Sequence, residues 1–176
     1  MTSSVRLAGT ALAVVVAALL QVALVPHLAW HGVGPALTLL VVVAFALVRG
    51  AQSGMVMGFL TGMLLDLVPP ADHLVGRWAL ALAVVGYVAG RVRSEMRDDA
   101  RPTMPTVLAT VAACSFVGTS VFALTGMILG DSSLGIGTLL QVIAVGMIWD
   151  LLLALPVVVP LMALLDRDAL ELGRVR

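Results

Sequence analysis

Long apolar runs, separated by short connections rich in proline, glycine and charge, constrain this chain more than any other feature. A helix needs about 20 apolar residues to cross the hydrocarbon core of a bilayer, and runs near this length recur along the whole sequence. We predict six membrane-spanning helices, with five as the alternative, over residues 7–25, 36–48, 51–68, 74–90, 106–129 and 139–165. The expected fold class is therefore all-α: a polytopic membrane protein whose compact helix bundle forms a single integral domain over residues 1–176.

The composition excludes the main classes of soluble protein. Of the 176 residues, 61% are hydrophobic and 11% are charged, whereas a soluble domain has about 25% charged residues. A soluble enzyme, a nucleic-acid-binding domain and a disordered chain are therefore excluded. The first apolar run exceeds the hydrophobic region of about 7–15 residues that is typical of a signal peptide. Because no clear small-residue cleavage site precedes Pro26, we expect this first helix to be retained.

The positions of the basic residues predict the orientation in the membrane. Arginine and lysine are enriched in cytoplasmic loops, and all ten basic residues of this chain are arginines. With six spans and a cytoplasmic N-terminus, nine of the ten lie on the cytoplasmic side, namely Arg6, Arg49, Arg91, Arg93, Arg97, Arg101, Arg167, Arg174 and Arg176. Only Arg77 falls outside. The opposite orientation would reverse this distribution, so we predict that both termini are cytoplasmic.

Small residues at a spacing of four mark two of the predicted helices. Gly54, Gly58 and Gly62 fall on one helical stripe, and such spacing lets two helix backbones approach closely in a membrane. The favoured interpretation is packing between helices of this protein; docking of a partner's helix is the alternative. Gly86 and Gly90 repeat the spacing in the next segment, which makes that segment the candidate packing partner.

Three charged residues fall within or beside the predicted spans. Asp66 extends the glycine stripe, and Arg77 follows it across a short connection, so we predict an ion pair or snorkelling of Arg77 rather than ligand or proton handling. Asp150 falls near the middle of the last span, where a carboxylate facing lipid would cost about 2.5–3.5 kcal/mol. It should therefore face the bundle interior. Hydrogen bonding to Ser, Thr or backbone is favoured, and a binding or relay role remains open. Pro156 and Pro160 predict a bend after it.

The remaining residue types give no catalytic pattern. His27, His31, Asp72 and His73 lie in outer connections, where solvated side chains are favoured over a transition-metal site. The single cysteine, Cys114, lies in an apolar run and is interpreted as packing. Neither a nucleophile elbow nor a metalloprotease or phosphate-loop motif is present. We therefore predict no enzyme, no catalytic residues, no metal and no cofactor.

Two sequence elements in the middle of the chain have a recognisable form. The first is G-F-x-x-G-x-x-x-D over Gly58–Asp66, and the second is G-Y-x-x-G-R over Gly86–Arg91. Together with Pro35 and the apolar helix that ends in Leu47-Val48-Arg49-Gly50, these elements resemble the bacterial rod shape-determining MreD family. The resemblance is densest over residues 35–93. The chain departs from it at Ala36, where many relatives carry an acidic residue, and at Arg77, where a small or polar residue is usual.

The resemblance implies a non-enzymatic membrane scaffold of the bacterial cell-elongation machinery, located in the cytoplasmic (inner) membrane. Such a scaffold binds a membrane-anchored MreC-like protein, helps to position peptidoglycan synthases and maintains rod shape, without nucleic acid or a small-molecule ligand. The family also resembles the S-components of energy-coupling-factor transporters in fold. The alternative is therefore a substrate-binding membrane subunit of a vitamin or metal transporter, which would use Asp150 or the outer histidines as ligands. A small-molecule site usually needs several convergent polar groups, and the outer side has few.

Overall fold

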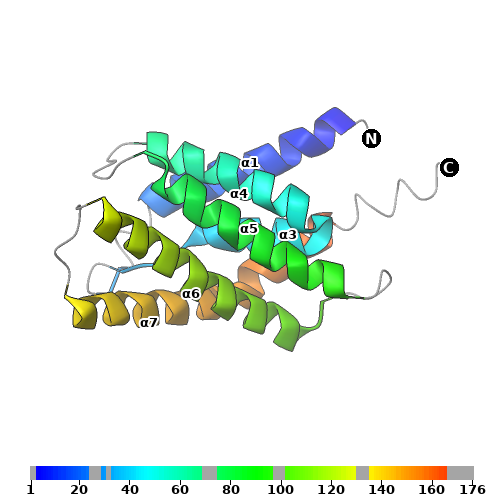
Figure 1. The fold of residues 1–176 in the computed structure, drawn as a ribbon. Helices are drawn as coiled ribbons and strands as arrows, with labels where there is room; N and C mark the ends of the chain where they lie inside the picture. The colour runs from blue at the N-terminus through cyan, green and yellow to red at the C-terminus, as the bar shows by residue number, and fades with distance from the viewer. Residues whose placement is uncertain are drawn as a thin grey trace.

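The computed structural model describes residues 3–23, 29–30, 33–68, 75–96, 102–129 and 135–165. This part of the chain is helical, with six α-helices and one π-helix, and an isolated bridge joins Trp30 and Val33. The elements are α1 (Ser3–Ala23), α3 (Leu37–Arg49), α4 (Ala51–Leu67), α5 (Arg77–Glu95), α6 (Met104–Ile128), α7 (Ile136–Leu153) and the π-helix η1 (Ala154–Val158). Figure 1 shows them packed lengthwise into one bundle.

Two helical segments are long and apolar enough to cross a membrane by themselves. They are Met104–Ile128, which is α6, and Gly137–Leu165, which contains most of α7 and continues through η1. Val14–Ala23 and Leu37–Arg49 are shorter apolar helices. The all-helical class is thus seen directly, while the six-span count stays a prediction.

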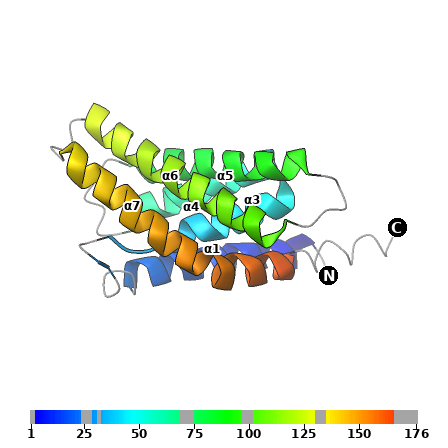
Figure 2. The same cartoon turned by 90° about the horizontal axis from the view of Figure 1, so that it is seen from below.

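The short helix α3 lies at the centre of the bundle. Its 13 residues cover roughly 20 Å, which is less than the hydrocarbon core of about 30 Å. Nine of them are buried, including Thr38, Leu40 and Leu47. A helix that is apolar on all sides must be surrounded by other helices, and in Figure 2 α3 lies between α5 and α1. It is therefore the core helix of the bundle.

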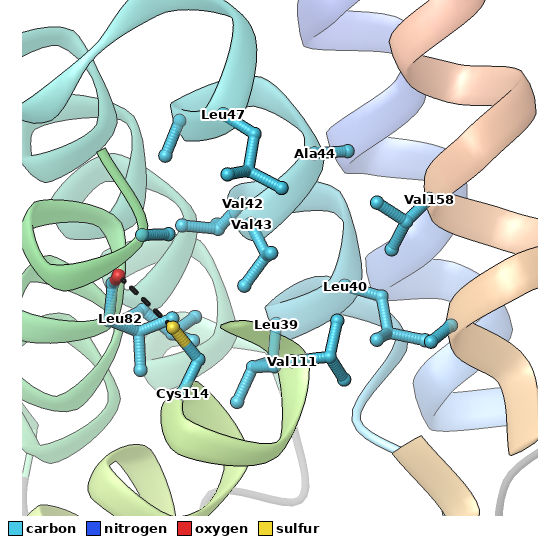
Figure 3. Packing of buried hydrophobic residues seen from close by; sticks show 14 of the residues in the cluster. Leu39, Leu40, Val42, Val43, Ala44, Leu47, Leu82, Val111, Cys114 and Val158 are labelled. Atoms are coloured by element: carbon cyan, nitrogen blue, oxygen red, sulfur yellow. Dashed lines mark hydrogen bonds between the residues drawn. The ribbon is translucent and has the colours of Figure 1, made fainter. Parts of the chain in front are cut away.

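The hydrophobic core is built around α3. Figure 3 shows side chains from α5, α6 and η1 converging on it, among them Leu82, Val111 and Val158. Cys114 belongs to this cluster, is fully buried, and its thiol lies 3.8 Å from the carbonyl oxygen of Val85. Cys114 therefore packs in the core as an apolar side chain would.

Helix α5 continues to Glu95, beyond the position near Gly90 where the sequence predicts the end of the membrane span. In the structure a Cβ at Gly90 would overlap the backbone of Ala51, so this glycine permits a close helix contact and does not end the helix. The exposed pair of Arg91 and Glu95, 3.1 Å apart and four residues apart in sequence, lies in the last turns.

The last helix changes its winding after Asp150. Residues 154–158 form η1, a π-helical segment that contains Pro156, and helical geometry resumes to residue 165. Proline cannot donate a backbone hydrogen bond, and a π-turn is one way in which a helix accommodates the loss. Figure 2 shows the helix axis changing direction there.

Candidate functional site

The glycines of α4 and α5 lie in the contact between these two helices. A Cβ on Gly58 would overlap the carbonyl oxygen of Leu82, and one on Gly54 would overlap that of Gly86. At the far end of the contact, a Cβ on Gly62 would overlap the backbone at Trp78. Each glycine of the α4 stripe therefore meets backbone atoms of α5, and any side chain would force the helices apart.

This placement leaves the glycine stripe covered within the protein. Gly54, Gly58 and Gly62 are buried, while the exposed face of α4 carries large apolar side chains such as Met55, Phe59 and Leu60. The predicted stripe thus packs along α5, where Gly54 meets Gly86 of the second predicted glycine spacing. A partner's helix could reach the stripe only by displacing α5.

Asp66, the last member of the stripe, binds the beginning of α5. Its carboxylate accepts hydrogen bonds from the backbone N–H groups of Gly76 (2.8 Å), Trp78 (3.2 Å) and Ala79 (3.1 Å). The first N–H groups of a helix have no partner within the helix and carry partial positive charge. Asp66 is 1% exposed, so it acts as a buried cap supplied by a neighbouring helix, whereas local caps come from the residue just before a helix.

We expect Asp66→Ala to destabilise the protein by about 2 kcal/mol, because three backbone donors lose their acceptor inside the bundle. Thermal unfolding of the purified protein in mild detergent measures the effect. Asp66→Asn, which keeps one acceptor oxygen, is the matched control and should lose less. An unchanged melting temperature for Asp66→Ala would show that the cap contributes nothing to stability.

Arg77, the first residue of α5, turns its side chain toward α6. It is 6% exposed, its Nη2 donates to the carbonyl oxygen of Phe122 at 3.0 Å, and its Cζ lies 4.1 Å from the centre of the Phe122 ring. Gly126 leaves room for the guanidinium, since a Cβ there would overlap it. The described contacts of Arg77 are thus with α6, and those of Asp66 are with the backbone of α5. The ion pair between the two stays a prediction.

Asp150 joins three elements in the interior. Its Oδ2 accepts a hydrogen bond from the Ser115 hydroxyl of α6 at 2.6 Å, and its Oδ1 accepts one from the backbone N–H of Ala36 at 2.8 Å. The side chain is 2% exposed. The geometry favours the structural interpretation of Asp150, with one partner of the expected type, a serine. The second partner, the N–H that precedes α3, is one that the sequence did not suggest.

The beginning of α3 receives a second cap from α1. Gln21 Oε1 accepts hydrogen bonds from both the backbone N–H (3.0 Å) and the hydroxyl (3.1 Å) of Thr38. Gln21 interrupts an otherwise apolar run, and this bond explains its presence. Together with Asp150, it satisfies donors at a helix start inside the bundle, where an unpaired polar group costs several kcal/mol in the absence of water.

Sequence reasoning located Asp66, Arg77 and Asp150 but did not identify the residues that they contact. Ser115, which donates to Asp150, and Phe122 and Gly126, which contact Arg77, carried no signal of their own, since such residues are common in membrane helices. Gln21 had a usable signal: a polar amide in an apolar run needs a buried partner.

The described residues contain no group of three or more His, Cys, Asp or Glu side chains close enough to hold a metal ion. The residues considered for such a site, His27, His31, Asp72 and His73, lie outside the described ranges.

These observations define a class of protein: an apolar helical bundle in which the buried Asp66, Arg77 and Asp150 serve as helix caps and interhelical links. The family model described as rod shape-determining protein MreD matches residues 2–167, and the chain therefore belongs to the MreD family of membrane proteins. The resemblance noted in residues 35–93 is confirmed and extends over nearly the whole chain. No curated protein and no solved structure matches the chain. The MreD family acts in rod shape determination, as part of the same system as MreC.

Proposed function

We propose that this protein is a non-enzymatic scaffold of the cell-elongation machinery that binds an MreC-like membrane-anchored protein and helps to position peptidoglycan synthases. The observation that carries the proposal is the family match over residues 2–167. The packing agrees with a scaffold, because the α4–α5 contact and the caps on α3 and α5 fix the helices relative to one another. In the described residues, the buried acidic groups are engaged by backbone and hydroxyl donors.

The proposed topology has six spans in the bacterial cytoplasmic membrane, with both termini in the cytoplasm. Figure 1 places the start of α1, the ends of α3 and α5, and the start of α6 at the same end of the bundle. Arg49 ends α3, and Arg91 and Arg93 lie in the last turns of α5. Basic residues therefore gather at the end where α1 begins, as the cytoplasmic preference of arginine requires. Arg77 begins α5 at the opposite end.

The contacts of Asp150 argue against the transporter alternative, in which this residue would be the main substrate ligand. Discontinuous helices in transporters direct their N-terminal ends at the substrate. The start of α3 could play this part, but Asp150 and Gln21 already occupy it. A substrate would first have to displace two side chains of the protein.

Affinity purification of the tagged protein from its own cells in mild detergent, followed by mass spectrometry, tests the proposal. We expect a single-span MreC-like protein and peptidoglycan synthases to be enriched at least about tenfold over a tagged, unrelated membrane protein of similar size, which corresponds to about 1.4 kcal/mol of preferential binding. Recovery of paired ATPases with a coupling membrane subunit would contradict the scaffold and support the transporter subunit.

A further inference from the structure

The exposed face of α4 is short for a membrane span. It begins with the polar side chains of Gln52 and Ser53, continues with apolar ones such as Met55 and Phe59, and ends at Leu67, all of them exposed. At 1.5 Å per residue, the helix rises by about 22 Å from Gln52 to Leu67. The hydrocarbon core of a typical bilayer is about 30 Å thick, so this face is about 8 Å too short to cross it.

Chemistry fixes both ends of this face. At one end α4 stops at Leu67, and non-helical backbone that faces lipid is not tolerated in the hydrocarbon core, so this helix end belongs at the membrane surface. At the other end a Cβ on Gly90 would overlap the backbone of Ala51, which puts the exposed Arg91 of α5 level with the start of α4. Tyr87, exposed one turn earlier, is of a type enriched at membrane–water boundaries. Polar side chains therefore begin at one level on both helices.

The other side of the bundle is long. Helix α6, which packs against α5, exposes apolar side chains from Met104 to Leu129, a rise of about 38 Å. The segment Gly137–Leu165 is also a long apolar helix. A helix longer than the hydrocarbon core can tilt to fit, and Figure 2 shows α6 and α7 inclined to α5. Tilting a short helix only reduces the thickness that it spans, so around α4 the bilayer has to adapt.

We propose that the short face, the exposed surface of α4 and α5 that carries Met55, Phe59, Leu60, Leu80 and Tyr87, thins the bilayer locally and prefers phospholipids with short acyl chains. Thinning is one of the ways in which a bilayer accommodates a short hydrophobic segment. Snorkelling, which long lysine and arginine side chains can use, is not open to the glutamine and serine at the start of α4. The inference goes beyond the scaffold function: it uses the proposed spanning of the membrane by these helices and is independent of partner binding.

Spin labels at both ends of the short face test the thinning in vesicles of dioleoylphosphatidylcholine. The labels are attached to Gln52→Cys or Leu67→Cys, built on Cys114→Ala, which removes the only native cysteine. Ala109→Cys and Leu124→Cys form the matched control pair, because they are exposed on α6 and the same number of residues apart. A water-soluble nickel chelate and oxygen, which partitions into hydrocarbon, report the surroundings of each label. The ratio of nickel to oxygen collisions should be severalfold higher at both α4 positions than at both α6 positions.

Each other pattern of collisions would overturn the proposal. Oxygen dominance at either α4 position would show that the bilayer keeps its full thickness along this face. Protection of both α4 positions from both reagents would show that another copy of the protein covers the face. Nickel dominance at the α6 positions as well would overturn the thinning together with the proposed membrane topology, so the two failures are distinguishable.

A competition between lipids tests the chain-length preference. Bimane on Phe59→Cys of α4 reports the short face, and bimane on Phe116→Cys of α6 is the control, since both phenylalanines are exposed to a similar degree. Nitroxide-labelled phosphatidylcholine quenches each fluorophore, and unlabelled dimyristoleoyl- or dierucoylphosphatidylcholine is added as competitor. The short-chain lipid should relieve quenching at Phe59→Cys severalfold more effectively than the long-chain lipid, and should have no such advantage at Phe116→Cys. The same chain-length dependence at both positions would overturn the preference of the short face for short-chain lipids.

Discussion

Gly58→Leu is expected to abolish the folded protein. The first atom of the new side chain would overlap the carbonyl oxygen of Leu82, which is backbone and cannot turn away as a flexible side chain could. Overpacking in a core costs about 1–3 kcal/mol and sometimes more, and here the clash requires two helices to separate. Fluorescence-detected size-exclusion chromatography should show loss of the monodisperse peak.

Gly137→Leu is the matched control for this experiment. It makes the same change in another helix, at a glycine where an added Cβ meets nothing within 4 Å, and should leave the peak unchanged. If Gly58→Leu instead folds normally but loses its partner, the stripe lies on the surface and the α4–α5 contact described above is wrong.

Asp150→Leu should strongly destabilise the protein. It leaves the N–H of Ala36 and the hydroxyl of Ser115 without their acceptor, and each buried unpaired donor costs about 1–3 kcal/mol. The total of roughly 2–6 kcal/mol is comparable with the whole stability of many domains. The melting temperature in mild detergent and the recovery of rod shape in cells depleted of the native protein are the two readouts.

Asp150→Asn separates the structural role of Asp150 from a binding or relay role. The amide keeps an acceptor oxygen for Ala36, and the Ser115 hydroxyl can rotate to accept from its NH2 group. We therefore expect near-normal stability and cell shape. A variant that folds normally but fails to restore rod shape would show that the carboxylate itself is required, and the structural interpretation would be wrong.

The α4 stripe was predictable from the sequence because the α-helix has a fixed number of residues per turn. A spacing of four puts Gly54, Gly58, Gly62 and Asp66 on one face whatever surrounds the helix. Glycines on that face are useful only against a close neighbour, so the sequence indicated a helix contact and a candidate second helix with Gly86 and Gly90. It left open whether the stripe was covered by this protein or by another, since both would select the same residues.

The length of α5 is a second property that the local sequence did not determine. The sequence predicts a membrane span that ends near Gly90, whereas the helix continues to Glu95. Gly90 permits the close contact with Ala51. A glycine beside arginine can mark a helix end or permit a helix contact, and only the packing of the helices distinguishes the two.

The sequence by itself determined that this chain is an apolar helical bundle, that Asp150 must avoid lipid, and that one face of α4 packs closely. These three properties follow from composition, periodicity and the cost of a charge in hydrocarbon, none of which depends on how distant segments pack. The MreD family was indicated by the resemblance of two short motifs and shown by the family match over residues 2–167. Only the tertiary structure decided that Asp66 caps α5, that Arg77 stacks on Phe122, and that Asp150 joins Ser115 to the start of α3. The partners of Asp150 lie 35 and 114 residues away along the chain, and no periodicity relates such positions, because a hydrogen bond between distant segments exists only once the helices have packed.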